Sequence, residues 1–554
     1  MNNEDQYVYL DIEADGLDPK NIWVVVCKHR GKHEVFTDAG TFKKYAEELT
    51  EATWVMHNGI GYDVPVLSSL WDHTWRPESI RDTLVLSRLW DPGLDGGHSL
   101  RAWGGRLGFP KDDHSDWSQL SDEMISYCKR DVDVTERLHQ KLMNECLKDF
   151  SEESIELEHQ VAWIIKEQET NGWLLDVRKA NDLVAFFKQK MLDIESDLQK
   201  TFPPIVEERW SDKTGKRLKD KVTVFNVGSR KQIAERLVTR GAVFKETTDK
   251  GTPIVDESTL KANLHVPEAA QVLEYLTLQK RYSQISSWLD HVDERTNRVH
   301  GRVNSNGAVT GRMTHSSPNV AQVPASSAEY GVVCRECWTV PEGKKLVGFD
   351  ASGLELRMLA HYMNDEDYTN VLLTGDIHTH NQVAAGLETR SQAKTFIYAL
   401  LYGAGDAKIG TIIGGGIREG KALKERFFNN LPALGDLRDR VDRAASRGYI
   451  IGLDGRRVRV RSEHAALNTL LQSAGALVMK KALVLLDDYA KQWRLDYRFC
   501  GNIHDEIQAE VLEKHADQFG YLGVECIKAA GIHFNLKCPL DGEYMVGTNW
   551  SETH

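Results

Sequence analysis

The sequence lacks several features that would place the protein in a special class. It has no run of eighteen consecutive apolar residues, so a membrane-spanning helix is not expected. The opening residues, MNNEDQYVYLDIEADG, lack the basic and apolar stretches of a secretory signal. The chain also lacks internal repeats and low-complexity segments. These absences predict a cytoplasmic protein with no membrane partner.

Cysteine is scattered through the chain. Of the eight cysteines, only Cys334 and Cys337 lie close together, in the segment CREC. A zinc site needs a second cysteine or histidine pair at similar spacing. The sequence offers no such pair, so it predicts reduced thiols rather than a metal or redox site.

An excess of positive charge is also missing, since the formal net charge is −13. Nucleic-acid binding needs local lysine and arginine, so the distribution of charge matters. Residues 1–150 hold 17 basic and 27 acidic side chains, whereas residues 209–250 hold 12 basic and 5 acidic. In GRRVRVR, Arg457, Arg459 and Arg461 alternate and would share one face of a strand. A nucleic-acid contact and a solvated basic face both remain open.

The length and the local patterns predict a multi-domain α/β protein. At 554 residues the chain is too long for one core, and three or four domains are expected. Residues 1–150 alternate strand-like and helical patterns, which indicates an α/β domain. Residues 151–300 are mainly helical, and from residue 301 turns, helices and strand pairs mix.

Two apolar runs each end in a carboxylate. Asp350 follows KKLVGF and precedes a helix, and Asp505 follows YRFCGNIH and precedes an alternating run. If the two strands pair, both carboxylates stay ionised only beside divalent cations. Two-metal phosphoryl transfer has this requirement. Taken alone, each aspartate is more typical of a helix or turn cap.

The segment RSQAKTFIYALLYGAG places two cations and two rings on one helical stripe. Arg390, Lys394, Tyr398 and Tyr402 follow one another at i+4 spacing, about 6 Å apart along the axis. A triphosphate along the helix would meet the two cations, and a base or sugar would meet Tyr398. An exposed amphipathic face is the alternative for this pattern alone.

The first 150 residues carry a second set of acids. Asp11 and Glu13 share one face of a strand, and Asp63 and Asp131 follow on separate elements. Tyr127 lies one helical turn before Asp131. Four such carboxylates could ligate two metals while the tyrosine orients a water. For any single acid, a surface position on an α/β domain is the alternative.

These segments together resemble a known family. DASGLELR, the Arg-x3-Lys-x3-Tyr-x3-Tyr-Gly spacing and HDE are similar to motifs A, B and C of family A (polymerase I-like) DNA polymerases. The phrases NGAVTGR, AKTFIY, LNTLLQSAGAL and HDEIQ resemble the replicases of T-odd bacteriophages. The resemblance extends over nearly the whole chain.

The resemblance implies an RNase H-like exonuclease domain followed by a right-hand polymerase with palm, fingers and thumb. The expected domains are the exonuclease (1–150), thumb and connecting helices (151–300), the first part of the palm (301–375), the fingers (376–448) and the second part of the palm (449–554). The expected activity is template-directed addition of dNTPs to a primer 3′ end, with 3′-5′ proofreading.

The resemblance also implies roles for individual residues. The expected metal ligands are the side chains of Asp350 and Asp505 and the carbonyl of Ala351. The expected nucleotide contacts are Arg390, Lys394, His378, Tyr398 and Glu355. Lys394 would also protonate the leaving pyrophosphate, and Glu355 would block a ribose 2′-hydroxyl. The expected DNA contacts are Arg312, Tyr402, Asn468, Gln472 and His504.

The acids of the first domain are similar to the Exo I, II and III motifs of DEDD 3′-5′ exonucleases that carry a tyrosine. The implied metal ligands are Asp11, Glu13, Asp63 and Asp131, with Tyr127 orienting the attacking water. All five are present, so an active nuclease is predicted. The acidic balance of residues 1–150 also fits a site that admits only a frayed strand.

The implied cofactor is Mg²⁺, two ions per active site, for which Mn²⁺ would substitute. The implied partners are primer-template DNA and dNTPs, and a replisome helicase or single-strand binding protein fits the same resemblance. Thioredoxin is not expected, because the long thumb insertion that binds it in the T-odd replicases is here either absent or reduced to EERWSDKTGKRLKDK. For a viral protein the expected location is the host cytoplasm.

Three other functions compete with this one. An RNA polymerase on the same palm is disfavoured by Glu355 together with Tyr398. A DEDD exonuclease whose polymerase half serves mainly to bind DNA is disfavoured because no residue of motifs A, B or C is missing. A non-catalytic DNA-binding protein would have to retain all six metal-ligand acids without using them.

Overall fold

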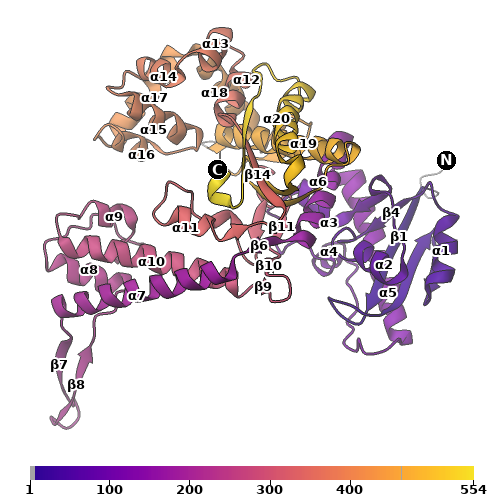
Figure 1. Cartoon of the computed structure of the whole chain (residues 1–554), viewed down its shortest axis with the longest axis horizontal. Coiled ribbons are helices and arrows are strands. Elements are labelled where there is room, and N and C mark those ends of the chain that lie inside the picture. The colour runs from indigo at the N-terminus through magenta and orange to yellow at the C-terminus, as the bar shows by residue number, and fades with distance from the viewer. Residues whose placement is uncertain (1–5, 463–464) are drawn as a thin grey trace.

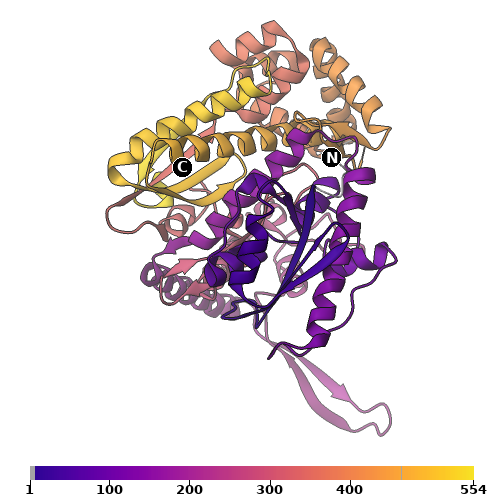
Figure 2. The ribbon, with the colours of Figure 1, turned by 90° about the vertical axis from the view of Figure 1, so that its right-hand side faces the viewer.

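The computed structural model describes residues 6–462 and 465–554. Figure 1 shows four parts: a front unit (residues 6–150), a central sheet built around β14, a helical lobe above it (residues 366–445), and a helical arm (residues 177–289). The mixed α/β character expected from the sequence is present in both the front unit and the central part. Figure 2, turned by 90°, shows the sheet of the front unit facing the viewer.

The front unit is a five-stranded sheet with helices on both faces. The strand order is β3-β2-β1-β4-β5, in which β1 runs antiparallel to β2 and parallel to β4. The strands are β1 (Tyr7–Ala14), β2 (Ile22–His29), β3 (Lys32–Phe36), β4 (Thr53–Met56) and β5 (Ile80–Asp82). The helices are α1 (Ala39–Glu47), α2 (Asp63–Trp71), α3 (Thr83–Trp90), α4 (Leu100–Arg106) and α5 (Asp122–Lys141).

Alternation along β1 decides which side chains face which helices. Val8, Leu10 and Ile12 belong to an apolar cluster that includes residues of α1 and α2. Tyr9 belongs to the opposite cluster, with Met124 and other residues of α5. Because side chains of a strand alternate between faces, the odd-numbered acids near the end of β1 share the α5 face with Tyr9.

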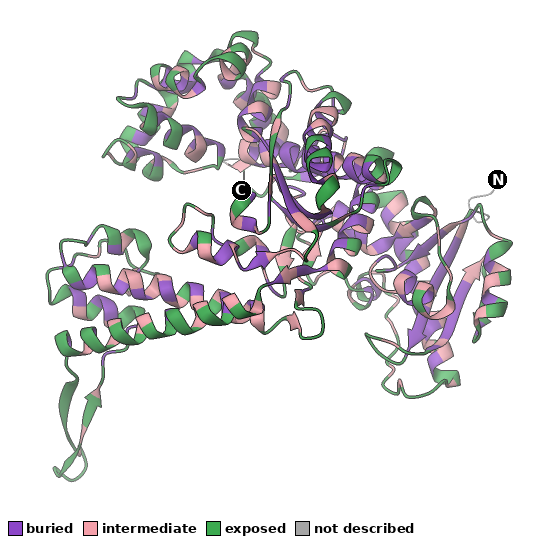
Figure 3. Ribbon diagram, in the orientation of Figure 1, coloured by how far each residue is buried: buried purple, intermediate pink, exposed green. Residues whose placement is uncertain are grey.

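Two long helices, α7 (Val177–Thr201) and α10 (Pro267–Leu289), pack along each other in the helical arm, which also carries two shorter helices and a hairpin at its far end. The shorter helices are α8 (Arg230–Val238) and α9 (Glu257–Lys261), and the hairpin contains β7 (Ile205–Trp210) and β8 (Arg217–Thr223). Nearly every hairpin residue is exposed, as Figure 3 shows. The short segment expected in place of a thumb insertion therefore forms a projecting hairpin.

The central sheet has the order β17-β18-β14-β19, with all neighbours antiparallel. Its strands are β14 (Lys344–Ala351), β17 (Tyr497–Ile503), β18 (Glu506–Leu512) and β19 (Gly542–Gly547), and α20 (Ala516–His533) packs against it. Gly348 lies in the middle of β14, where an added Cβ would lie 2.2 Å from the Gln508 side chain and 2.5 Å from the Thr553 carbonyl. Glycine at this position permits that close approach.

The remaining elements surround the central sheet. The helical lobe contains α13 (Glu366–Thr374), α14 (Ile377–Ala385), α15 (Arg390–Leu401), α16 (Asp406–Thr411), α17 (Ile417–Asn430) and α18 (Pro432–Ala445). Four further helices lie outside the helical lobe: α6 (Glu152–Asn171), α11 (Gly331–Arg335), α12 (Leu354–Met363) and α19 (Ala466–Gln492). The short strands are β6 (Trp173–Leu175), β9 (Val292–Asp293), β10 (Arg298–Val299), β11 (Arg302–Asn304), β12 (Thr314–Ser316), β13 (Trp338–Thr339), β15 (Tyr449–Ile451) and β16 (Arg457–Arg459).

Helix α19 is apolar for a different reason from a membrane helix. Within the part of the chain that the structure describes, it is the one helix long and apolar enough to cross a bilayer, with a mean hydropathy of 1.4 over eighteen residues. Of that window, 83% is buried inside the protein. The hydropathy of α19 is therefore explained by its place in the core.

The arginines of the GRRVRVR segment lie differently from what the sequence suggested. Strand β16 ends at Arg459, so Arg461 is not part of an alternating face. Arg457 pairs with Asp149 at 2.7 Å and Arg459 pairs with Asp91 at 2.8 Å. Both acids belong to the front unit. The expected three-cation strand face is wrong, because these arginines join the front unit to the rest of the chain.

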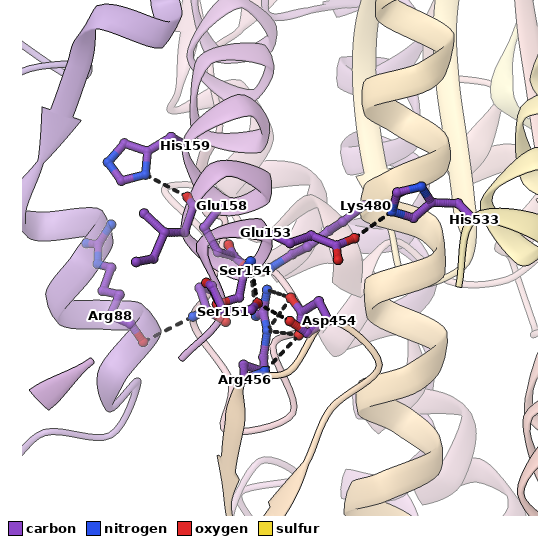
Figure 4. Close-up of polar contacts among 12 residues, drawn as sticks. Arg88, Ser151, Glu153, Ser154, Glu158, His159, Asp454, Arg456, Lys480 and His533 are labelled. Atoms are coloured by element: carbon purple, nitrogen blue, oxygen red, sulfur yellow. Dashed lines mark hydrogen bonds and ion pairs between the residues drawn. The ribbon is translucent and has the colours of Figure 1, made fainter. Parts of the chain in front are cut away.

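A buried ionic cluster reinforces the same junction, as shown in Figure 4. Glu158 of α6 accepts hydrogen bonds through one oxygen from Arg456 Nη1 and Lys480 Nζ, each at 2.6 Å. Arg456 also contacts Asp454 at 2.7 Å, and all four side chains are at most 4% exposed. Burial is the main cause that lowers the pKa of Lys480 to about 8. Breaking such a buried pair on one side is costly.

We expect Glu158→Gln to lower the free energy of unfolding by about 3–5 kcal/mol, because Lys480 would keep a buried charge without its carboxylate. Thermal and chemical unfolding at pH 7 measure the change. Glu145→Gln, which breaks a more exposed i,i+4 pair with Lys141, is the control and should leave the midpoint unchanged.

The pH dependence provides a second check on the same variant. The pKa of Lys480 is about 8 in the folded protein and near 10.5 in the unfolded chain. The unfolded chain therefore binds more protons between these values, so this group makes stability rise with pH there. The loss caused by Glu158→Gln should shrink from pH 7 to pH 10, as Lys480 becomes neutral. A loss that stays constant over this range contradicts the assignment.

Candidate functional site

Two groups of carboxylates stand out, one at a strand end of the central sheet and one in the front unit, where the acids come from β1, α2 and α5. The central site contains Asp350 and Asp505 with the side chains around them, and the front cluster contains Asp11, Glu13, Asp63 and Asp131. Helix α6 connects the front unit to the central part of the chain.

Strand pairing brings the two acids of the central site to one edge of the sheet. Asp350 lies near the end of β14, directly opposite Glu506 of β18 and Glu543 of β19. Asp505 lies in the tight turn between β17 and β18, after His504, which has a positive φ of 60°. The N–H of Ala351 donates to the carbonyl of Asp505 at 3.4 Å.

Crowding makes the central carboxylates resist ionisation. Burial raises the pKa of Asp350, and the neighbouring Asp505 raises it further. Burial also raises the pKa of Asp505, and Glu355 adds to the effect. Carboxylates that repel each other in this way favour a bound cation. Their oxygen atoms are the hard ligands that Mg²⁺ and Mn²⁺ prefer.

Glu506, next to Asp505 in sequence, has a different environment. It is buried, and it accepts hydrogen bonds from Gln508 Nε2 at 2.6 Å and from the indole N–H of Trp550. His554 Nδ1 lies 3.2 Å from its second oxygen. These contacts hold the strand beside Asp350. The sequence showed the adjacent acids but carried no local signal for these distant partners.

Helix α12 presents Glu355 to two of the expected DNA contacts. The Tyr402 hydroxyl donates to Glu355 Oε1 at 3.1 Å, and Arg312 Nη2 lies 3.6 Å from the same oxygen. Glu355 lies in the first turn of α12, which begins four residues after Asp350. The structure therefore brings residues from three distant segments together beside the strand end.

Helix α15 carries the expected stripe. It begins after the N-cap Thr389, which forms a capping box with Gln392. Arg390 and Lys394 are exposed, and the rings of Tyr398 and Tyr402 stack at 6.4 Å and 23°. His378 on α14 lies near Tyr398, with ring centroids 6.1 Å apart.

Asp376 is a neighbour of the stripe that the sequence pattern did not indicate. It caps α14 by accepting from the N–H groups of His378 at 3.1 Å and Thr379 at 3.3 Å. Its second oxygen accepts from Arg390 Nε at 2.6 Å. Hydrogen bonding to Arg390 is the main cause that holds the pKa of Asp376 well below its usual range.

The first turns of α19 carry the expected pair of amides. Gln472 Nε2 donates to Asn468 Oδ1 at 2.9 Å. Gly403, just beyond α15, has a φ of +74°, and an added Cβ there would lie 3.7 Å from the Asn468 Cβ. This close approach places the end of the tyrosine stripe against the amide pair.

In the front cluster, Asp11 and Glu13 lie on the β1 face that meets α5. One ligand atom each from Asp11, Glu13 and Cys128 lies within 4.8 Å of the other two. Cys128 Sγ is 3.6 Å from Asp11 Oδ2. The sequence had not indicated Cys128, which directly follows Tyr127. Its thiol lies beside Asp11 and Glu13 because of how α5 packs on β1.

Asp63 begins α2, and a second buried acid fixes the preceding loop. Asp82 accepts from the N–H groups of Asn58 at 2.8 Å and Ile60 at 3.1 Å. It also accepts from Leu84 N at 2.9 Å as the N-cap of α3. Asp82 therefore supports the segment that carries Asp63 into the cluster.

The front cluster is strongly crowded. Burial is the largest cause that raises the pKa of Glu13 to about 8 and that of Asp63 to about 7. The pKa of Asp11 lies well above its usual range, through burial and then through repulsion by Glu13, Asp131 and Asp63. Asp131 Oδ1 is buried with no hydrogen-bond partner. A buried oxygen without a partner among crowded acids fits a divalent cation.

Known proteins match this chain over most of its length. The model of DNA polymerase family A matches residues 206–552. The chain is 35% identical to a DNA-directed DNA polymerase of Enterobacteria phage T3, covering 98% of this chain and 99% of that protein. It is 34% identical to a DNA-directed DNA polymerase of Escherichia phage T7, covering 90% and 92%. The family resemblance read from the motifs is confirmed.

A solved structure gives the same fold. The POL domain of Pol1 from M. smegmatis, in complex with DNA primer-template and dNTP, superposes with a TM-score of 0.81. The match covers 98% of this chain and 95% of that one at 20% sequence identity. The fold expectation of a mixed α/β polymerase is thereby confirmed.

We expect Glu13→Gln to stabilise the protein in EDTA. The folded-state pKa of Glu13 is about 8, above its ordinary value of 4.5, so its ionisation reduces stability as the pH rises between these values. The variant should exceed the wild type by on the order of 1 kcal/mol or more at pH 8 and by little at pH 5.

Thermal unfolding in EDTA at the two pH values measures the effect. Glu34→Gln, at an exposed position of β3, controls for the removal of one negative charge. A Glu13→Gln variant that is less stable than the wild type at pH 8 would contradict the view that the acids repel one another.

Proposed function

Because this chain belongs to DNA polymerase family A, we propose that it extends a primer 3′ end by two-metal phosphoryl transfer at the central site. We also propose that the front cluster removes 3′-terminal nucleotides as a proofreading nuclease. The observation that carries the first proposal is the meeting of Asp350 and Asp505 at one sheet edge, where the charge of Asp505 also acts on the rings of Tyr398 and Tyr402.

At the central site, the side chains of Asp350 and Asp505 and the carbonyl of Ala351 would hold two Mg²⁺ ions, or Mn²⁺ in their place. When bound, such ions activate the attacking hydroxyl and stabilise the leaving oxygen. Arg390 and Lys394 bind the triphosphate, to which Arg390 presents a planar fork of donors. In this proposal the triphosphate replaces Asp376 as the partner of Arg390.

The remaining residues orient the substrates. His378 supports the triphosphate, and Lys394 gives a proton to the leaving pyrophosphate. Tyr398 lies against the sugar and base, and Tyr402 guards the template position. Glu355 excludes a ribose 2′-hydroxyl. The proposal is supported by the contacts among Glu355, Tyr402 and Arg312, which join the sugar pocket to the DNA-binding side.

Recognition of the primer-template end is proposed for polar groups on three elements. Arg312, Asn468, Gln472 and His504 would contact the minor groove, where every correct pair presents purine N3 or pyrimidine O2 acceptors. Contacts of this kind test the shape of a pair without reading its sequence. The proximity of Gly403 to Asn468 supports a common surface for these groups.

At the front cluster, Asp11, Glu13, Asp63 and Asp131 would hold the metal ions of the nuclease. Tyr127 orients the water that attacks the terminal phosphodiester. The proposal is supported by the buried Asp131 Oδ1 without a partner and by the raised pKa values of the acids. Residues 1–150, which include the front unit, are accordingly proposed as an RNase H-like exonuclease domain.

The other domain bounds follow from the same proposal. The helical arm corresponds to the thumb within residues 151–300, and the helical lobe to the fingers at 376–448. The palm takes residues 301–375 and 449–554, which supply β14 and the β17-β18-β19 part of the central sheet.

We expect the two activities to separate by mutation. Asp505→Asn should reduce primer extension by at least about a thousandfold, because it removes a proposed metal ligand. It should leave the binding of primer-template DNA and the degradation of single strands intact. Asp131→Asn should give the opposite pattern. Extension, excision and DNA-binding assays with the same two proteins measure both.

The pattern of results identifies which proposal fails. If Asp505→Asn retains extension, the polymerase site is misassigned. If Asp131→Asn retains excision, the nuclease site is misassigned. Loss of DNA binding in Asp505→Asn would indicate a general structural defect, which circular dichroism and thermal unfolding detect.

We expect the wild type to prefer dNTPs, and Glu355→Ala to weaken that preference by at least about tenfold, because the carboxylate no longer blocks the 2′-hydroxyl. Single-nucleotide incorporation of dNTP and rNTP, compared as kcat/KM, measures it. Glu366→Ala on α13, away from the central site, is the control. Efficient rNTP use by the wild type would favour the RNA polymerase alternative.

A further inference from the structure

Lys111 occupies a position that the proposed nuclease chemistry does not explain. It lies in the connection between α4 and α5, among residues without regular secondary structure. The chain is anchored just before it: Arg130 Nε donates to the Pro110 carbonyl at 2.9 Å. The guanidinium groups of Arg130 and Arg137 lie over the Phe109 ring, at 3.2 and 3.6 Å from its centroid. These contacts fix where Lys111 enters the cluster.

The Lys111 side chain points into the front cluster. Its ammonium forms an ion pair with Asp131 Oδ2 and lies 4.8 Å from the centroid of the Tyr127 ring. The side chain of Lys111 is only 15% exposed, and that of Asp131 is 4% exposed. A lysine is seldom buried to this extent unless a carboxylate compensates its charge.

The charge of Lys111 acts on other acids besides its partner Asp131. Lys111 is the cation that electrostatically favours the ionised forms of Asp11, Glu13 and Asp131 together. Arg101 also favours the ionised form of Asp131, but Lys111 is the cation whose charge acts on all three acids. Asp131 is also a proposed metal ligand, so the lysine on its Oδ2 and a metal ion on its unpartnered Oδ1 would share one carboxylate.

We propose that Lys111 is a built-in counter-ion of the front cluster, which takes a cation position until a metal ion arrives and then competes with that ion for Asp131. The inference rests on the proposed metal binding of the front cluster. An ammonium and a divalent ion repel each other across one carboxylate, so metal binding favours movement of Lys111 away from Asp131. The flexible four-carbon stem permits this movement.

Two measurable consequences follow. Without Lys111 the cluster has a more negative potential, and a divalent ion gains more from that potential than a proton does. Metal affinity should therefore rise. The metal-free protein should lose stability, since the crowded acids lose their counter-ion, and added metal should restore that stability.

The test uses Mn²⁺ binding at pH 8, followed by electron paramagnetic resonance of the free ion. All proteins carry Asp350→Asn and Asp505→Asn, so the central site lacks its two proposed carboxylate ligands. Lys111→Met is compared with Lys28→Met as a matched control. Lys28 is also 15% exposed and pairs with two acids of α5, Asp133 at 2.6 Å and Glu136 at 2.8 Å, outside the cluster.

We expect Lys111→Met to tighten Mn²⁺ binding by at least about fivefold relative to the parent, and Lys28→Met to leave it unchanged. In EDTA the thermal midpoint of Lys111→Met should fall, and saturating Mn²⁺ should recover it. If Lys111→Met folds poorly, Lys111→Gln tests the same loss of charge. Lys111→Arg, which keeps the charge, should bind Mn²⁺ as the parent does.

The outcomes separate the inference from the proposed function. Mn²⁺ binding that is abolished by Asp131→Asn but unchanged or weakened in Lys111→Met overturns the counter-ion inference and leaves the metal site standing. Absence of Mn²⁺ binding in the parent overturns the metal site, and the inference with it. Tighter binding in both lysine variants also overturns the inference, since it would report only a general loss of positive charge.

Discussion

Antiparallel pairing of β14 with β18 is the constraint on which the central site depends. The register sets Asp350 opposite Glu506 and brings the Asp505 turn to the same edge. This arrangement is electrostatically unfavourable. Burial and the neighbouring acids raise the pKa values of Asp350 and Asp505. Backbone hydrogen bonds and the close packing at Gly348 hold the strands despite this repulsion. The site is thus prepared for cations by the sheet itself.

The acids of the front cluster also repel one another, but they are brought together and compensated in a different way. Its acids come from β1, α2 and α5, so helix packing rather than a single sheet register brings them together. Lys111 offsets part of their repulsion, and Asp82 fixes the loop before Asp63. Stability and the proposed chemistry are opposed here, since removing an acid would relieve the repulsion and also remove a proposed metal ligand.

Ionic contacts also join the two halves. Glu158 of α6 holds Arg456 and Lys480 in a buried cluster, while Arg457 and Arg459 reach acids of the front unit. A basic stretch that resembled a nucleic-acid contact in the sequence is thus committed to holding the proposed nuclease unit against the polymerase part.

The sequence predicted what depends on local period and missed what depends on long-range packing. Asp11 and Glu13 share a strand face by alternation, and the α15 stripe follows from i+4 spacing, so both were predictable. Lys111 lies in an irregular segment. Asp376, the N-cap of α14, pairs with Arg390 at the start of a different helix, α15. No local sequence pattern therefore marked either residue. Arg456 shows the converse: its charge was visible, but its burial against Glu158, 298 residues away, was not. Charge in a sequence therefore indicates function only once its partners are known.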